Sequence, residues 1–123
     1  MSPTDLLLVD DDAAFRSTAR ALLTSAGFRV LAEAASGMDA LAAAAAIGPA
    51  LVLLDVQLPD IDGFEVARRL RAQPDPPAVV LISTREAIDY GRRIRDCGAL
   101  GFITKSSLTP ASLRAMLQID GSG

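Results

Sequence analysis

Residues 51–63 read LVLLDVQLPDIDG, an apolar run that ends in an aspartate and a turn. Four consecutive apolar residues are typical of a strand that is buried on both faces, as in a parallel sheet. Pro59 and Gly63 favour a turn, because proline fixes φ and glycine adopts conformations that other residues avoid. The stretch therefore predicts a buried strand at 51–54 that places Asp55 at its carboxyl end, with a loop behind it.

Similar apolar runs recur along the chain and alternate with stretches of helical periodicity. Further strands are expected at 6–9, 28–32, 78–82 and 100–103. Helices are expected at 13–26, 64–71 and 86–97, between Ser36 and Gly48, and after Thr109. Gly91 weakens the helix at 86–97, by about 1 kcal/mol relative to alanine.

The strict alternation of strands and helices predicts a parallel sheet with helices on both faces. With five strands and five helices, the expected α/β fold is doubly wound and flavodoxin-like, with strand order 2-1-3-4-5. The 123 residues fit one domain, expected at 1–119, and residues 120–123 are expected to form a flexible tail or a truncated linker. The apolar run at 41–47 is far too short for a membrane span, and the N-terminus lacks a signal-peptide pattern. We therefore expect a cytoplasmic protein without membrane contact.

The composition excludes several classes of site. The chain has no histidine, so it cannot form a Ser-His-Asp triad or a histidine metal site. Its single cysteine, Cys97, cannot form an internal disulfide. With twelve basic against fifteen acidic residues, we expect no direct nucleic-acid binding by this domain. A bound metal would have to accept oxygen ligands, as magnesium, manganese and calcium do.

Polar residues stand at the carboxyl end of four of the five expected strands. They are Asp10 and Asp11, Asp55, Ser83 and Thr84, and Lys105. In the expected strand order these ends are neighbours, so the side chains should share one pocket. Several carboxylates in one pocket repel each other and need a cation, for which magnesium is suited. A lysine and a hydroxyl beside that ion suit a phosphoryl group, and a free aspartate is a competent nucleophile toward phosphorus.

Four segments carry a family resemblance. They are LLLVDDD at 6–12, LVLLDVQLPDIDGFE at 51–65, VVLIST at 79–84 and GALGFITK at 98–105. In this order, and each at a strand end, they resemble the receiver (REC) domain of bacterial two-component response regulators, the CheY-like fold. The resemblance covers about residues 5–119, which is nearly the whole chain.

The resemblance implies a role for each matching residue. Asp55 matches the phosphoacceptor, and Lys105 matches the lysine that pairs with the phosphoryl group. Asp10 and Asp11 match the acid pair that holds Mg²⁺ (or Mn²⁺), together with Asp55. The backbone carbonyl of Gln57, two residues past the acceptor, matches the remaining protein ligand of the metal.

Two hydroxyls compete for the position of the family's switch residue. Counting back from the lysine without a gap favours Ser83 and leaves Thr84 on the following small-residue position. Phe102 matches the strand aromatic whose rotamer follows that hydroxyl in the family. Two residues depart from the family's pattern: Ser106 stands where proline is usual, and Arg85 is large for the rim of the site.

The resemblance implies a phosphorylation-dependent signalling switch rather than an enzyme, with only self-catalysed phosphotransfer and slow autodephosphorylation. A sensor histidine kinase would supply the phosphoryl group, and the face made by residues 86–97, 100–103 and the last helix would change to control an output. The alternatives are a receiver-like interaction module that is not phosphorylated and, less favoured, an aspartyl-nucleophile phosphohydrolase. A homodimer and a DNA-binding output domain beyond residue 123 are both left open.

Overall fold

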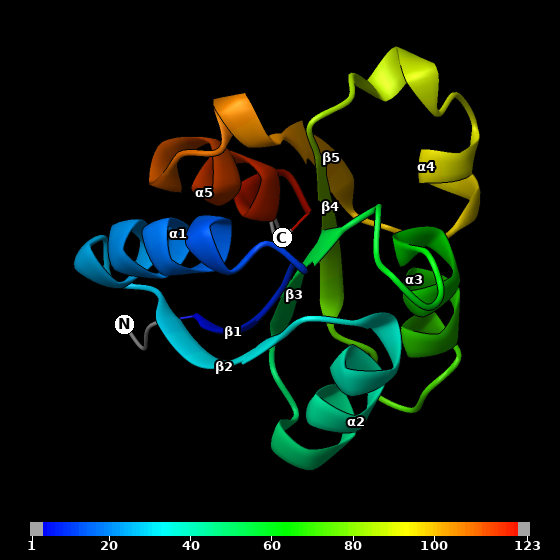
Figure 1. Ribbon diagram of the computed structural model, residues 1–123, viewed down its shortest axis with the longest axis horizontal. Coiled ribbons are helices and arrows are strands. Elements are labelled where there is room, and N and C mark those ends of the chain that lie inside the picture. Colours follow the sequence, from blue (N-terminus) through cyan, green and yellow to red (C-terminus); the bar gives the residue numbers. More distant parts are fainter. Residues whose placement is uncertain (1–3, 121–123) are drawn as a thin grey trace.

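The computed structural model describes residues 4–120, which form a parallel sheet between two layers of helices (Figure 1). The strand order is β2-β1-β3-β4-β5, and every neighbouring pair of strands is parallel. The strands are β1 (Asp5–Val9), β2 (Arg29–Ala34), β3 (Leu51–Asp55), β4 (Ala78–Ser83) and β5 (Gly101–Thr104). The predicted fold class and strand order are confirmed.

Helices cover both faces of the sheet. They are α1 (Ala13–Ser25), α2 (Gly37–Ile47), α3 (Gly63–Arg71), α4 (Arg93–Asp96) and α5 (Pro110–Asp120). Short 3-10 turns lie at Ala87–Asp89 and Lys105–Ser107. Helices α1 and α5 lie on one face, and α2, α3 and α4 lie on the other (Figure 1). Within residues 4–120, no helix combines the length and the apolar character needed to cross a membrane.

The central strands are apolar throughout because both of their faces are covered. In β1, Leu6 and Leu8 pack into the cluster beneath α1 and α5, which includes Leu113. Leu7 and Val9 point to the opposite face and join the cluster beneath α2 and α3. All four strand residues are fully buried. Neighbouring residues of one strand thus enter two different cores, which accounts for the continuous apolar runs in the sequence.

Polar caps start three of the helices close to the strand ends. Asp12 caps α1 by accepting hydrogen bonds from two backbone N–H groups, at 3.0 and 3.3 Å. Ser36 and Asp62 cap α2 and α3 in the same way, each accepting one bond, at 3.2 and 2.9 Å. Each cap contributes about 1 kcal/mol. The cap at Asp12 confines the segment between β1 and α1 to three residues, which include Asp10.

The predicted helix at 86–97 is wrong as a continuous element. The structure has a 3-10 turn at Ala87–Asp89 and then the four-residue α4. Between them Gly91 adopts φ +58°, a left-handed conformation that glycine reaches without steric cost and that ends a helix. The interruption turns the chain, so that Ile88 on the first turn is 87 % exposed while Tyr90 is half-buried.

Strand β2 lies later in the chain than predicted, at Arg29–Ala34 instead of 28–32. Leu6 pairs with Val30 and Leu7 with Ala32, so one residue of β2 has no partner in β1. Such an extra residue is a β-bulge, which interrupts the alternation of side chains. The sequence pattern alone therefore misplaced the boundary of this edge strand.

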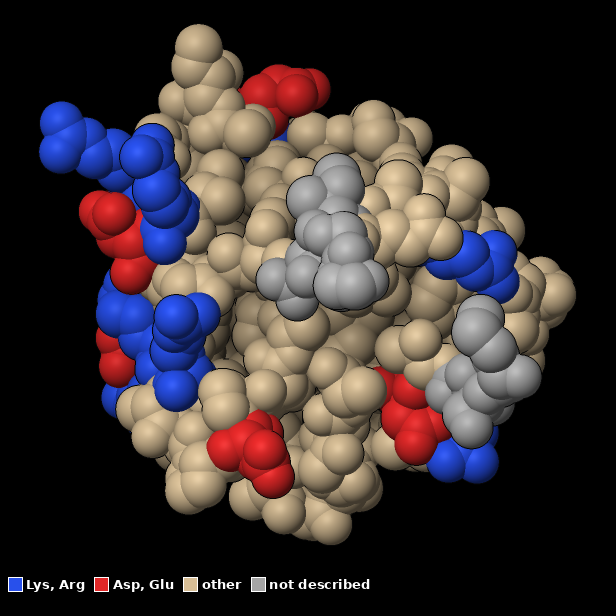
Figure 2. Space-filling model, turned by 180° about the vertical axis from the view of Figure 1, so that it is seen from behind, with Lys and Arg blue, Asp and Glu red and all other residues tan. Residues whose placement is uncertain are grey.

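Arginine side chains gather on the edge formed by α3 and α4, seen at the left of Figure 2. Arg68 and Arg69 both pair with Glu65, at 2.9 and 2.8 Å. Arg93 pairs with Asp62 at 3.2 Å and lies 4.3 Å from the centroid of a neighbouring aromatic ring. These ion pairs are exposed and each contributes little to stability, so this edge is a solvated surface.

Gly63 begins α3 against the backbone of the residue that ends β3. A Cβ at this position would lie 2.4 Å from the carbonyl oxygen of Asp55 and 2.9 Å from the Cα of Val56. Backbone atoms cannot move aside as a flexible side chain can. Only a residue without a Cβ therefore allows α3 to start directly behind Asp55.

We predict that Gly63→Ala lowers the free energy of unfolding by about 2–3 kcal/mol, because the added methyl overpacks the site. The matched control is Gly91→Ala, whose Cβ meets no atom within 4 Å and which bears only the left-handed φ. That control should cost about 1 kcal/mol. Urea unfolding of both variants measures the difference, and equal losses would contradict the steric explanation.

Candidate phosphoacceptor and metal site

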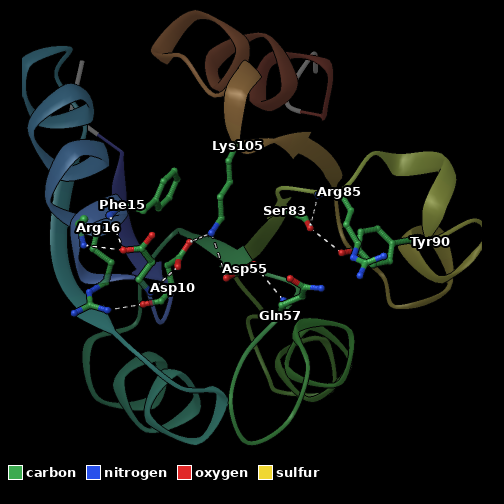
Figure 3. Close-up of polar contacts among 11 residues, drawn as sticks. Asp10, Phe15, Arg16, Asp55, Gln57, Ser83, Arg85, Tyr90 and Lys105 are labelled. Atoms are coloured by element: carbon green, nitrogen blue, oxygen red, sulfur yellow. Dashed lines mark hydrogen bonds and ion pairs between the residues drawn. The ribbon is translucent and has the colours of Figure 1, made fainter.

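Polar side chains meet at the carboxyl edge of the sheet (Figure 3). Asp10 directly follows β1, Asp55 ends β3, Ser83 ends β4 and Lys105 directly follows β5. These strands are consecutive neighbours in the sheet. The structure therefore brings these residues together at one edge, as the strand ends predicted.

Three carboxylates form the acidic part of the site. Asp10, Asp11 and Asp55 each offer one oxygen, and these oxygens all lie within 4.8 Å of one another. Asp10 is fully buried, Asp55 is nearly so, and Asp11 is exposed at the mouth of the site. Like charges this close repel strongly where water is excluded, so the cluster favours a cation.

Lys105 supplies the ammonium group of the site. Its Nζ lies 2.6 Å from Oδ2 of Asp10 and 3.4 Å from Oδ2 of Asp55. It also lies 4.6 Å from the centroid of the Phe15 ring, in the range of a cation–π contact. Its side chain is only 15 % exposed. The ammonium is thus held between two buried carboxylates and an aromatic face.

The surroundings of Asp55 favour its protonated form. Burial raises the pKa of this carboxyl, and the charge of Asp10 raises it further. A hydrogen bond from the Gln57 N–H and the charge of Lys105 lower the pKa, but only in part. The net pKa is about 6. Without a further cation, a carboxylate at this position is therefore less stable than an ordinary exposed one.

Burial lowers the pKa of Lys105, but its contacts with the carboxylates outweigh burial. The hydrogen bond with Asp10 and the charges of Asp55 and Asp10 raise the pKa above its ordinary value overall. The lysine therefore remains a cation throughout the physiological range. Three carboxylates beside one ammonium leave an excess of negative charge at the site.

The donor set fits a hard divalent cation such as Mg²⁺. Oδ2 of Asp10 is fully buried and lies 2.6 Å from the ammonium of Lys105. Burying a charged oxygen costs free energy unless opposite charge is near, and a divalent cation would supply more of that charge. Asp11 and Asp55 add the other two carboxylates of the cluster.

Gln57 lies beside the acidic cluster through its backbone. Its N–H donates to Oδ1 of Asp55 at 3.1 Å, so the chain folds back over the carboxylate immediately after β3 (Figure 3). This contact places the Gln57 main chain next to the cluster. The predicted use of its carbonyl as a metal ligand stays a prediction.

The two candidate hydroxyls differ in their surroundings. Ser83 is fully buried, and its Oγ lies 2.7 Å from Oη of Tyr90 and accepts a hydrogen bond from the Arg85 N–H at 3.1 Å. Thr84 is exposed. Phe102 is half-buried, and its ring centroid lies 5.8 Å from that of Tyr90. The burial of Ser83 at the strand end supports its choice over Thr84.

Three residues in or near the site did not emerge from the sequence. Arg16 donates to the backbone carbonyl of Asp10 at 2.6 Å and to Glu33 at 3.0 Å, which fixes the end of β1 (Figure 3). Phe15 faces Lys105, and Tyr90 contacts Ser83. The helical spacing of α1 would have placed Phe15 and Arg16 near its start. For Tyr90 the only sequence signal is that it is the one tyrosine of the chain.

Comparison with known proteins identifies the family. Residues 6–118 match the response regulator receiver domain. The chain belongs to this family. It is therefore a phosphorylation-dependent signalling domain, a phosphoacceptor protein rather than an enzyme. The cluster of Asp10, Asp11 and Asp55 beside Lys105 is the acidic pocket of this receiver domain.

Several relatives support this assignment. The chain is 40 % identical over 116 residues to the transcriptional regulatory protein AfsQ1 of Streptomyces coelicolor, covering 92 % of the chain and 51 % of that protein. It is 34 % identical over 116 residues to the response regulator GacA of Pseudomonas aeruginosa, covering 93 % and 54 %. The chain thus spans about half the length of the curated relatives that it matches.

Solved structures agree with the fold of this receiver domain. A two-component response regulator of the LuxR family from Aurantimonas superposes with a TM-score of 0.85 at 28 % identity, covering 96 % of this chain and 84 % of the other. The chemotaxis response regulator CheY4 of Vibrio cholerae superposes with a TM-score of 0.82 at 27 % identity, covering 95 % and 98 %. The CheY-like strand order is therefore shared with known response regulators.

We predict that the metal-free protein loses stability as pH rises from about 4 to about 6, because its folded state holds the Asp55 proton more tightly than the unfolded chain does. The loss attributable to this carboxyl is about 3 kcal/mol and levels off above the folded pKa of about 6. Asp55→Asn should lack this part of the loss. Urea unfolding in a chelator across this range measures it, and parallel profiles for the two proteins would contradict the prediction.

We predict that Mg²⁺ raises the free energy of unfolding by about 2.7 kcal/mol at one hundred times its Kd. Asp11→Asn should weaken this response strongly, because it removes one charged oxygen of the cluster. Asp12→Asn is the matched control, since asparagine also caps a helix and Asp12 is not part of the cluster. A full magnesium response in the Asp11 variant would contradict the assigned site.

Proposed function

We propose that Asp55 is the residue that accepts the phosphoryl group. The observation that carries this proposal is the position of its buried carboxylate, within 4.8 Å of ligand oxygens of Asp10 and Asp11 and 3.4 Å from Nζ of Lys105. The carboxylates suit a divalent cation and the ammonium suits phosphoryl oxygens. Asp55 lies where both groups can act on the same phosphorus.

In the transfer, a carboxylate oxygen of Asp55 attacks the phosphorus in line with the leaving group. The new O–P bond forms an acyl phosphate as the P–N bond of a phosphohistidine, or the P–O bond of acetyl phosphate, breaks. Residues 1–123 contain no histidine, so a phosphohistidine donor lies outside them. The leaving imidazole or acetate departs with the electron pair of the broken bond.

Each neighbour of Asp55 has a separate task. Magnesium or manganese, held by Asp10, Asp11, Asp55 and the Gln57 carbonyl, would supply positive charge to the phosphoryl oxygens. Lys105 stabilises the charge that develops on those oxygens during transfer. A divalent cation held by Asp10 would share this carboxylate with Lys105, whose Nζ lies 2.6 Å from Oδ2 of Asp10.

Phosphorylation then changes the conformation of the domain. Ser83 donates a hydrogen bond to a phosphoryl oxygen, with the neighbouring Thr84 as the weaker candidate for this role. Phe102 turns inward as Ser83 engages, and the face of α4, β5 and α5 changes between two states. The short α4 and the bend at Gly91 support this role, because few backbone hydrogen bonds hold this segment in one conformation.

The partners follow from the same chemistry. A sensor histidine kinase is the phosphoryl donor, in the cytoplasm, where the single thiol of Cys97 stays reduced. The output is a DNA-binding domain of the same protein or a separate partner. Relatives that are transcriptional regulators about twice the length of this chain support the first of these outputs. The α4-β5-α5 face could also serve a homodimer.

We predict that incubation with acetyl phosphate and Mg²⁺ adds one phosphoryl group to the protein and that Asp55→Asn abolishes the addition. The matched control is Asp62→Asn, which keeps the cap of α3 and leaves the acidic cluster intact. Intact-mass spectrometry measures the labelling, and hydroxylamine sensitivity identifies the acyl phosphate. Undiminished labelling of the Asp55 variant would show that another residue is the acceptor.

A further inference from the structure

The hydroxyl of Tyr90 contacts the buried hydroxyl of Ser83 (Figure 3). The ring of Tyr90 packs against two aromatic rings, with centroids 5.3 Å from Phe64 and 5.8 Å from Phe102. These contacts help to hold the ring in the position where its hydroxyl oxygen lies 2.7 Å from that of Ser83. This contact does not belong to the acidic cluster, and none of the roles assigned above uses it.

The hydrogen-bonding capacity of Ser83 fixes what the contact does. A serine hydroxyl can accept two hydrogen bonds and donate one. The N–H of Arg85 already donates to Oγ of Ser83 at 3.1 Å. Either hydroxyl of this pair can be the donor, and the phenol is the more acidic of the two. When Tyr90 donates, both acceptor sites of the Ser83 oxygen are filled.

The hydroxyl proton of Ser83 is then still available to donate a hydrogen bond. Among the contacts of the described residues, this hydroxyl makes no hydrogen bond to Asp55 or Lys105, although all three lie at the same edge of the sheet. A phosphoryl oxygen is an acceptor that can take this proton without displacing either existing bond. The arrangement thus prepares Ser83 as a donor only.

We infer that Tyr90 is a positioning residue for phosphorylation: it donates a hydrogen bond to Ser83 and so directs the serine proton toward the phosphoryl group on Asp55. This inference rests on the proposed roles of Asp55 and Ser83. Tyr90 acts through Ser83 and does not touch the phosphoryl group. The bend at Gly91 belongs to the same arrangement, because it follows Tyr90 directly where the predicted helix is interrupted.

The test compares Tyr90→Phe with the unmodified chain in acetyl phosphate and Mg²⁺. Phenylalanine keeps the ring beside Phe64 and Phe102 and removes only the hydroxyl. Losing one hydrogen bond of ordinary strength should slow phosphorylation, or speed loss of the phosphoryl group, by about fivefold. In a Ser83→Ala background the same change at Tyr90 should have less than about a twofold effect, because the residue through which Tyr90 acts is gone.

Tyrosine fluorescence gives a second readout that a merely structural role would not move. The chain has one tyrosine and no tryptophan, so the signal reports Tyr90 alone. Adding Mg²⁺ and beryllofluoride, which mimics the phosphoryl group, should change this fluorescence in the unmodified chain and leave it unchanged in Ser83→Ala. Urea unfolding of Tyr90→Phe checks that the variant remains folded.

Four results would overturn the inference. A Tyr90→Phe variant that gains and loses the phosphoryl group as fast as the unmodified chain shows that the contact has no role. Faster phosphorylation of the variant shows that Tyr90 restrains Ser83 instead. An equal effect in the Ser83→Ala background shows that Tyr90 acts by another route. If the unmodified chain itself gains no phosphoryl group on Asp55, the proposed function fails first and this role fails with it.

Discussion

The burial of carboxylates against a single ammonium is the constraint on which this receiver domain depends. Two ionised carboxylates about 5 Å apart cost about 3 kcal/mol at an effective dielectric constant near 20. Asp10 and Asp55 are nonetheless buried, because β1 and β3 are covered on both faces and deliver them to the same edge. Lys105 offsets part of the repulsion between these carboxylates, and a bound cation would have to offset the rest. The folded state is therefore prepared for a cation and a transferable anionic group together.

Most of the fold could be predicted from the sequence, because apolar runs that alternate with helical periodicity leave few arrangements of five strands. The failures lie where local geometry overrides the pattern. The segment 86–97 has helical spacing, yet Gly91 turns the chain and leaves only the four-residue α4. The bulge between β1 and β2 displaced the boundary of β2 in the same manner. Both depend on backbone conformations that periodicity does not report.

The candidate site was predictable for a different reason. Asp10, Asp55 and Lys105 stand at strand ends, and the strand order alone makes them neighbours. The contact between Ser83 and Tyr90 could not be derived in this way, because it depends on how the segment after β4 folds back. Periodicity gives the face of a helix on which a residue lies, but it gives no position for a residue in an irregular turn.

The exposed turn at Ala87–Asp89 lies only one residue before Tyr90 in the chain. Ile88, at its centre, is 87 % exposed, whereas the hydroxyl of Tyr90 reaches the buried Ser83. This short segment thus has an apolar side chain in solvent, that of Ile88, and a polar group in the site, the hydroxyl of Tyr90. Thermodynamic linkage is reciprocal. A molecule that binds the exposed turn in only one of its conformations therefore changes the affinity of the site for the phosphoryl group. The phosphoryl group changes the affinity of the turn for that molecule by the same factor. A partner that binds this turn would then also affect how readily Asp55 is phosphorylated.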